Sequence, residues 1–237
     1  MSHSTGFKVH SLELGPMENF IHIIQDLATG HAAVVDPAWD VPAIIAELDK
    51  HQATLSDIFL THSHHDHING LDELLQSYPA ARVHISGEEA TFWRNGPVEA
   101  ILHKDGDELF IGDTRVRWLL TPGHTPGSSC FLMDKTLITG DTLFIFGCGR
   151  CDLKGGDPVQ MYATLQDLKS KIPDDAIVYT GHNYGDRPTS SMALQREGNP
   201  FLHWKDVDSF VRYRMEIHDK VRDTPYGPVS PEELSLS

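Results

Sequence analysis

The sequence has 237 residues, 40% hydrophobic and 22% charged, a composition typical of an ordinary folded protein and not of a collagen-like, coiled-coil or disordered chain. The 19 Lys and Arg residues stand against 34 Asp and Glu residues, and the formal charge of -15 disfavours nucleic acid or an anionic membrane as a partner. Three cysteines, an odd count, argue against a disulfide framework, and no apolar run is long enough to span a membrane.

The first half of the chain reads as strands followed by alternating helices and strands. At its start there is no basic segment followed by an apolar stretch of signal-peptide length, so we expect a cytoplasmic protein. Turn signals separate short strands predicted over residues 7–14, 20–27 and 32–35, which indicates an antiparallel start. The apolar spacing then predicts a helix over 41–51 capped by Asp40, a strand over 57–60, a helix over 69–78 and a strand over 82–85.

The second half begins with two hairpins. The patterns over residues 107–121 and 128–139 each predict two short strands joined by a tight turn. A helix is expected after Asp157, a strand over 176–179 and a charged helix over 207–221. Strands accompanied by helices in each half indicate an α+β or layered α/β/β/α arrangement.

Fifteen histidines are an unusual number, and imidazole is a common ligand of transition metals. Ten of them are scattered along the chain, and we assign these to surface or locally satisfied roles. They are His3, His10, His22, His31, His51, His65, His84, His103, His203 and His218. The other five fall into motifs at the ends of predicted strands.

The first motif, Thr61-His62-Ser63-His64-His65-Asp66-His67, directly follows the strand predicted over 57–60. Extended backbone places His62 and His64 on one face, while Asp66 and His67 stand at the entrance to the next helix. Four potential ligands in six residues indicate a metal site more strongly than a polar turn.

Three further motifs each place one chemically active residue in a loop after a strand. His124 stands between two Pro-Gly turns, Asp141 follows the run 136–138, and His182 follows the strand predicted over 176–179. Any one of them alone would fit an ordinary turn residue. Together with the histidine-rich motif they indicate side chains that converge on one site.

The H-x-H-x-D-H motif, followed by an isolated His, Asp and His at strand ends, resembles the metallo-β-lactamase superfamily of metal-dependent hydrolases over roughly residues 7–200. The resemblance implies an α/β fold, a four-layer αββα sandwich with the site at one sheet edge. Residues 1–200 would form the catalytic domain, and residues 201–237 a short helical C-terminal extension.

The same resemblance implies two divalent metal ions. Five His and two Asp form a nitrogen and oxygen donor set that suits zinc, with iron and manganese as alternatives. Asp66 and Asp141 are the implied catalytic residues, and Asp141 would bridge the metals. The implied ligands are His62, His64 and His124 for the first metal, Asp66, His67 and His182 for the second, and Asp141 for both.

Within the superfamily, Gly147-Cys148-Gly149-Arg150 and Gly181-His182-Asn183-Tyr184 are similar to the glyoxalase II branch, which hydrolyses S-acylglutathione thioesters. This similarity implies a small glutathione-derived thioester as substrate, cleaved by a metal-activated hydroxide. Arg150 would contact a substrate carboxylate and Tyr184 the glutathione backbone. A guanidinium fork suits a carboxylate, and a surface or intrachain ion pair is the alternative role of Arg150.

Two departures from that branch favour a sister branch, the persulfide dioxygenases. Asp152 stands where glyoxalase II enzymes have an aromatic glutathione contact, and the sequence after His182 is short for them. Cys-Gly-Arg-x-Asp and Asn199-Pro200 also resemble the sister branch, whose enzymes oxidise glutathione persulfide with a single iron. That iron is held at the positions of His62, His124 and Asp141, so the motif leaves both activities open.

Other functions fit the sequence less well. A β-lactamase would be expected to carry an export signal, and the acidic composition gives no sign of a nucleic-acid surface. Cys148 and Cys151 form a C-x-x-C pair, but a zinc ribbon needs a second pair and the neighbouring glycines indicate a loop instead of a redox motif.

Overall fold

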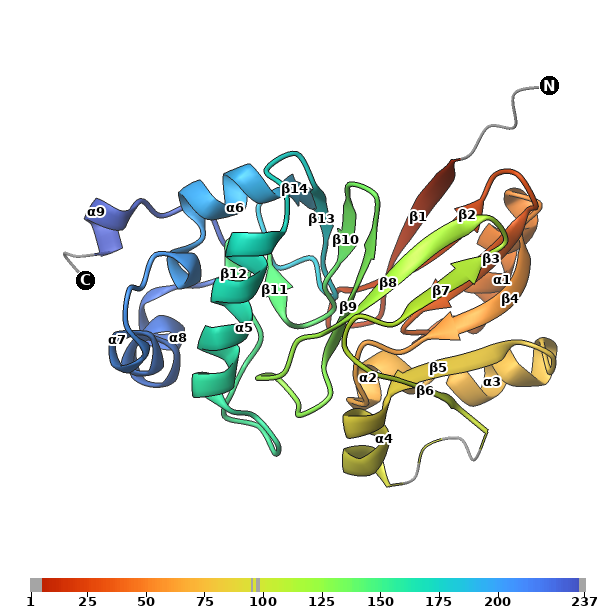
Figure 1. The fold of residues 1–237 in the computed structure, drawn as a ribbon, viewed down its shortest axis with the longest axis horizontal. Coiled ribbons are helices and arrows are strands. Elements are labelled where there is room, and N and C mark those ends of the chain that lie inside the picture. Colours follow the sequence, from red (N-terminus) through yellow and green to blue (C-terminus); the bar gives the residue numbers. More distant parts are fainter. Residues whose placement is uncertain (1–5, 95, 97–98, 235–237) are drawn as a thin grey trace. The chain divides into compact units, whose positions relative to one another are not determined.

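The computed structural model describes residues 6–94, 96 and 99–234, so His3 lies outside the described residues. The chain forms two compact units, one up to Leu119 and one from Leu120 onward. The predicted α/β class is confirmed, because the strands form two larger sheets and a small hairpin and are accompanied by several helices (Figure 1). None of the helices among the described residues combines the length and apolar character that a membrane span needs.

The first unit opens with the predicted antiparallel strands and then alternates strands and helices. Its strands are β1 Phe7–Leu14, β2 Asn19–Asp26, β3 His31–Val35, β4 Thr54–Phe59, β5 Arg82–Ser86, β6 Ile101–His103, β7 Glu108–Ile111 and β8 Thr114–Leu120. Its helices are α1 Val41–Lys50, α2 His65–Ile68, α3 Leu71–Ser77 and α4 Gly87–Trp93.

Strands β1 to β6 lie side by side in chain order in one sheet, antiparallel from β1 to β3 and parallel from β3 to β6. Helices α1 and α3 cover one face of this sheet, where Ile44 and Leu74 join a core with Ile21 and Val34 (Figure 1). The predicted cap of α1 is confirmed, since the Asp40 carboxylate accepts a hydrogen bond from the Ala43 amide at 3.0 Å. Parallel β3 and β4 end at the same edge, so the segments that follow them lie together.

The second unit has shorter strands and more helix. Its strands are β9 Ser129–Met133, β10 Thr136–Ile138, β11 Leu143–Phe144, β12 Gly147–Cys148, β13 Ile177–Tyr179 and β14 Thr189–Ser191. Its helical segments are α5 Pro158–Lys171, α6 Met192–Gly198, the 3-10 turn η1 Pro200–Leu202, α7 Val207–Arg212, the π-helical turn η2 Tyr213–Ile217, α8 His218–Val221 and α9 Pro231–Leu234.

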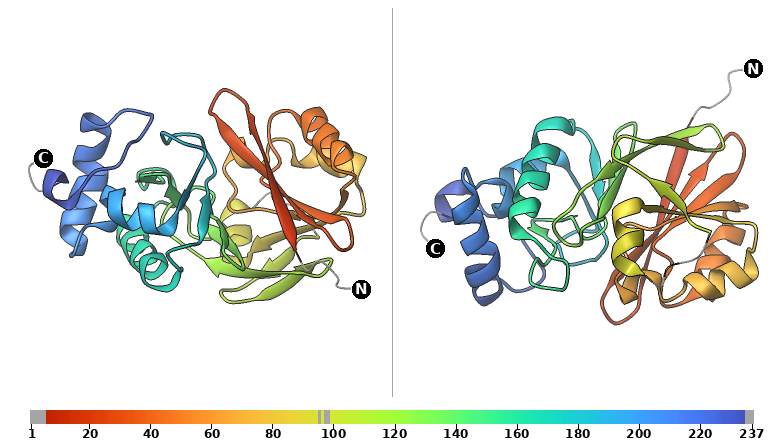
Figure 2. Two further views of the ribbon diagram at one scale, coloured as in Figure 1. Left: turned by 90° about the horizontal axis from the view of Figure 1, so that it is seen from above. Right: turned by 60° about the horizontal axis from the view of Figure 1, so that its bottom comes forward.

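The second unit also brings two strand ends to one edge. Strand β10 pairs antiparallel with β9, as the predicted hairpin requires, and parallel with β13. The loops that follow β10 and β13 therefore leave the sheet at the same edge. Helix α5 buries the predicted stripe of Met161, Leu165 and Leu168 and lies beside α7 (Figure 2).

Near the C-terminal end the structure differs from the sequence prediction. The single helix predicted over 207–221 is divided into α7, η2 and α8, because the backbone widens to π-helical hydrogen bonding at residues 213–217. Tyr213, Arg214 and His218 are buried there. Strand β4 also begins three residues before the predicted start at residue 57.

Candidate metal centre

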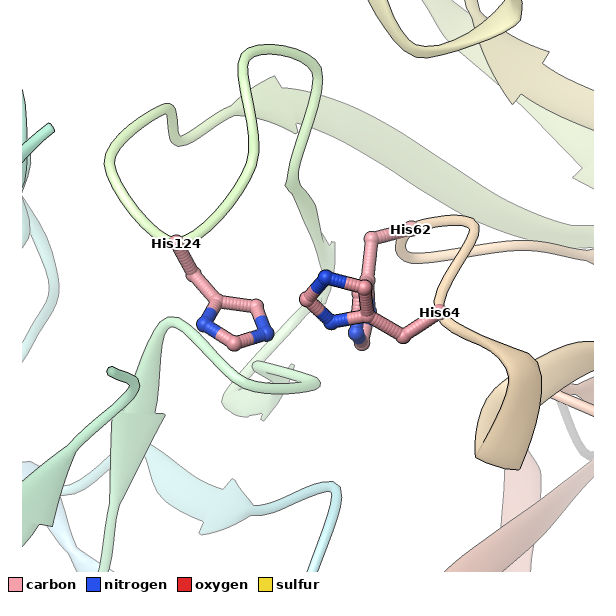
Figure 3. Close-up of side chains that lie close together, drawn as sticks. All are labelled: His62, His64 and His124. Atoms are coloured by element: carbon pink, nitrogen blue, oxygen red, sulfur yellow. The ribbon is translucent and has the colours of Figure 1, made fainter. Parts of the chain in front are cut away.

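The histidine motif occupies the loop that leaves β4 and enters α2. His62 is fully buried and His64 is half-buried, and their ring centroids lie 4.7 Å apart (Figure 3). His67, the third histidine with an implied ligand role, is buried with its ring centroid 4.2 Å from that of His62. The first unit thus brings together three of the four histidines of the motif, while the fourth, His65, is exposed.

Asp36, which follows β3, holds this loop in place although the sequence analysis gave it no role. Its carboxylate accepts hydrogen bonds from the Thr61 amide at 2.7 Å, the Thr61 hydroxyl at 2.5 Å and the His67 ring Nδ1 at 3.0 Å. Because a carboxylate only accepts, Nδ1 of His67 carries the hydrogen and Nε2 keeps its lone pair. A carboxylate that orients the distal nitrogen of a histidine is a common partner of metal ligands.

Asn19, at the start of β2, fixes Asp66 in a similar way. The buried Asn19 amide donates hydrogen bonds to the Asp66 carboxylate at 3.0 Å and to its backbone carbonyl at 3.1 Å. Its own carbonyl oxygen accepts a hydrogen bond from the Trp39 indole at 2.8 Å. In the sequence Asn19 stands just before the strand predicted over 20–27, a position that does not distinguish it from a turn residue.

The second unit groups His124, Asp141 and His182 around one carboxylate oxygen. Asp141 Oδ2 lies 3.5 Å from His124 Nε2 and 3.3 Å from His182 Nε2, and all three residues are buried. His124 projects from the loop between β8 and β9 (Figure 3). Its Nδ1 donates a hydrogen bond of 2.7 Å to the Arg150 carbonyl, which leaves the lone pair of Nε2 directed at the carboxylate side.

Two glycines allow the loops of the second unit to approach this group. A Cβ atom at Gly149 would stand 1.9 Å from the backbone oxygen of Asp141 and 3.0 Å from His124 Nδ1. A Cβ atom at Gly181 would stand 2.4 Å from Asp141 Oδ1. Any side chain at either position would therefore push the strand-end loops apart.

The two residues with an implied substrate role lie in different surroundings. The Tyr184 ring stacks on the His182 ring, with centroids 4.6 Å apart and planes 10° from parallel. Arg150 is exposed and forms a bidentate ion pair with Asp152, at 2.9 Å and 2.7 Å. This is the intrachain ion pair named above as the alternative role of Arg150. It lowers the pKa of Asp152 to about 2.

The C-x-x-C pair has no features of a reactive thiol site. Cys148 and Cys151 are both buried and neither forms a disulfide. Burial raises the pKa of Cys151 to about 12 and that of Cys148 well above its usual range. Thiols with such pKa values are protonated at neutral pH, which disfavours both nucleophilic chemistry and metal binding by this pair.

The donor atoms in both units have separations that fit a metal. Two ligands held about 2.0–2.1 Å from one tetrahedral zinc lie about 3.3–3.4 Å from each other. The distances from Asp141 Oδ2 to the two histidines, and the 3.4 Å between Asp66 Oδ2 and His67 Nε2, are close to this value and longer than ordinary hydrogen bonds. The His and Asp clusters are therefore consistent with a divalent metal site.

Comparison with known proteins gives a consistent picture. A family model described as the metallo-beta-lactamase superfamily matches residues 14–182. The probable polyketide biosynthesis zinc-dependent hydrolase PksB of Bacillus subtilis (strain 168) is 34% identical, over 90% of this chain and 96% of that protein. A hydroxyacylglutathione hydrolase of Brucella anthropi is 36% identical, over 90% of this chain and 91% of that protein. The crystal structure of ETHE1 from Myxococcus xanthus superimposes with a TM-score of 0.80 at 30% identity, over 89% of this chain and 91% of that one.

Proposed function

This chain belongs to the metallo-beta-lactamase superfamily, and on that premise we propose that it hydrolyses a thioester, with an S-acylglutathione as the substrate class. The observation that carries the proposal is the position of Asp141. Its Oδ2 lies 3.5 Å from His124 Nε2 and 3.3 Å from His182 Nε2, close to the separation of two ligands that share one metal. A carboxylate placed in this way can serve two metals at once. A relative named hydroxyacylglutathione hydrolase, 36% identical, supports the substrate class.

We assign His62, His64 and His124 to the first metal and Asp66, His67 and His182 to the second, with Asp141 shared. Bound divalent metals would supply a water of lowered pKa and polarise the thioester carbonyl. Asp36 and Asn19 keep His67 and Asp66 in the orientation that ligation needs.

The other residues of the site need only bind and orient the substrate. A thiol leaves with a pKa of about 8.5, so it departs as thiolate without a general acid from the protein. Tyr184, stacked on His182, presents its phenol next to a metal ligand, where it can bind the glutathione backbone. The Arg150 guanidinium can bind a substrate carboxylate once its ion pair with Asp152 is broken.

The presence of Asp152 supports a second candidate function, that of a persulfide dioxygenase with a single iron. In the glyoxalase II branch an aromatic residue at this position contacts glutathione, whereas Asp152 binds Arg150 in a closed ion pair. The Cys-Gly-Arg-x-Asp segment and Asn199-Pro200 are the parts of the sequence that resemble the sister branch. This activity would need only His62, His124 and Asp141 as ligands.

Matched assays separate the two candidates. The purified protein is analysed for metal and then given S-lactoylglutathione, an acyl thioester of N-acetylcysteamine, and glutathione persulfide. We expect two divalent metals per chain, thiol release from S-lactoylglutathione and no oxygen uptake. A single iron, oxygen uptake with the persulfide and intact thioesters would overturn the hydrolase proposal. Release from the N-acetylcysteamine ester alone would keep the thioesterase but exclude glutathione as the carrier, an outcome suggested by the relative named a polyketide biosynthesis hydrolase.

A further inference from the structure

The one fully buried residue of helix α4 is acidic. Of the seven residues of this helix, all of which the structure describes, Glu89 alone is buried and is 0% exposed, while the apolar Ala90 and Trp93 are only partly buried. A helix that packs on a core normally turns its apolar side chains inward, and glutamate is almost never fully buried without a partner. Because removing a carboxylate from water costs free energy, the contacts of Glu89 must offset this cost.

The fold brings this carboxylate to the histidine loop. Strands β4 and β5 pair in parallel, so the loop that follows β4 and helix α4, which follows β5, begin at the same sheet edge. Ser86 caps the helix by accepting a hydrogen bond of 3.1 Å from the Glu89 amide, which fixes the point from which the Glu89 side chain extends. In the sequence the spacing Ser86-x-x-Glu89 is typical of a helix start, so the local pattern gives Glu89 no other role.

Glu89 holds the residue that joins the first two histidines of the motif. Its Oε1 accepts a hydrogen bond of 2.8 Å from the Ser63 amide and one of 2.6 Å from the Ser63 hydroxyl. Neighbouring residues of an extended segment point to opposite sides, so Ser63 faces Glu89 while the rings of His62 and His64 meet on the other side. The peptide between the two histidines is therefore fixed from the side opposite the proposed ligands.

This contact differs from that of Asn19 in the residues it controls. Asn19 holds Asp66, which we assign to the second metal. Glu89 holds the backbone between His62 and His64, which we assign to the first metal. The two buried side chains should therefore influence different metals.

We propose that Glu89 is a positioning residue for the first metal, which orients His62 and His64 by holding Ser63 from outside the site. The inference rests on the proposed function, whose ligand assignment it uses. It applies to both candidate activities, because His62 is a ligand in each of them. Loss of the carboxylate leaves the peptide between the two histidines free to turn, so metal binding has to order both side chains and becomes weaker.

The test is the stepwise removal of zinc from the full-length protein. Wild type, Glu89→Ala and Glu88→Ala are loaded with zinc and dialysed against buffers of falling free Zn²⁺, and the zinc that stays bound is counted per chain. Glu88 is the matched control, because it is the neighbouring acidic residue of α4 and is exposed.

We expect Glu89→Ala to release one zinc at a free Zn²⁺ concentration about 10- to 100-fold higher than the wild type does, and to keep the other zinc as the wild type does. Glu88→Ala should release both as the wild type does. A purely structural role of Glu89 would not distinguish the two metals. Release of both metals at the wild-type concentrations, or an equal weakening of both, overturns the proposal.

A milder variant tests the contact without changing α4. Ser63→Ala removes the hydroxyl contact and keeps the amide contact, so it should weaken binding of the first metal a few-fold. In the Glu89→Ala background the same substitution should add nothing, because its partner is already absent. Additive losses would show that the two residues act independently, which contradicts the proposal. Unfolding of each metal-free variant shows whether it folds as the wild type does.

A double variant shows that the two metals are controlled separately. Asn19→Ala combined with Glu89→Ala should leave no metal bound with wild-type affinity, and a double variant that keeps one such metal would contradict the assignment of Glu89. A wild type that holds a single metal would instead contradict the two-metal hydrolase. In that case weaker binding by Glu89→Ala supports the role of Glu89, and unchanged binding overturns it.

Discussion

Asp36 and Asn19 hold the side chains of the histidine loop at the scale of single residues. Each is buried, and each directs a hydrogen-bonding group at a proposed ligand, Asp36 at His67 and Asn19 at Asp66. Without these contacts the ligand side chains would have to be ordered when metal binds, which costs free energy. The affinity of the site should therefore depend on residues that do not touch the metal.

Asp36→Asn tests this dependence. The substituted amide puts a donor where the wild type has only acceptors, so one of the contacts to Thr61 or His67 is lost. We expect metal affinity to fall about 10- to 100-fold, measured by competition with a chelating dye. His65→Ala, in the same motif but exposed, should keep the wild-type affinity. An Asp36→Asn protein that folds and binds metal normally would show that His67 needs no orienting carboxylate.

The Arg150–Asp152 ion pair leads to a prediction about substrate binding. If Arg150 binds a substrate carboxylate, Asp152 competes for the same guanidinium, and an exposed pair contributes about 0–1 kcal/mol. Asp152→Asn should therefore lower KM for an S-acylglutathione by up to about fivefold, and Arg150→Ala should raise it. Metal content should stay unchanged in both variants. Steady-state kinetics that show the same KM for all three proteins would remove Arg150 from the substrate site.

At the scale of elements, the broken C-terminal helix encloses a charged group instead of presenting it to solvent. Arg214 is buried and its Nη2 donates to both oxygens of Asp219, at 2.7 Å to each, and His218 Nδ1 lies 2.7 Å from Oδ1 of the same carboxylate. Burial lowers the pKa of His218 to about 4. Protonation of this histidine is therefore disfavoured in the folded segment α7–η2–α8.

The pH dependence of stability follows from His218. Between pH 6.5 and 4 the unfolded chain binds a proton that the folded chain excludes, so stability falls as the pH drops through this window, by about 3 kcal/mol in total. His218→Gln should remove this part of the acid sensitivity. Urea unfolding at pH 7 and pH 5 measures it, and an equal loss of stability in the wild type and His218→Gln would contradict the role of His218.

The helices and hairpins that could be predicted are those in which the apolar residues of the sequence pattern are also the residues that the structure buries. Helix α1 and helix α5 bury the residues that their spacing placed on one face, and both hairpins turn where the sequence indicated. The π-helical turn could not be predicted, because Arg214 and His218 are buried by contacts with each other and Asp219 and not by apolar character.

At the scale of the whole molecule, the proposed ligands are divided between the two units. His62, His64, Asp66 and His67 come from the first unit, and His124, Asp141 and His182 come from the second. The motifs could be recognised from sequence because each stands directly after a strand. Asp36 and Asn19 could not, because their role depends on tertiary contacts across 25 to 47 residues with a loop that the local pattern does not connect to them.

Bound metal should stabilise the folded chain. A ligand present at 100 times its dissociation constant adds about 2.7 kcal/mol to stability when only the folded state binds it. Stripping the metal with a chelator should lower Tm, and added Zn²⁺ should restore it. Calorimetry measures the change, and an identical Tm with and without metal would show that the donor groups bind none.

The proposed two-metal site is tested by a crystal structure of the metal-loaded protein with anomalous scattering recorded on both sides of the zinc edge. We expect two anomalous peaks, one held by His62, His64 and His124 and the other by Asp66, His67 and His182, with the Asp141 carboxylate in contact with both. A single peak, or peaks held by ligands of one unit only, would contradict it.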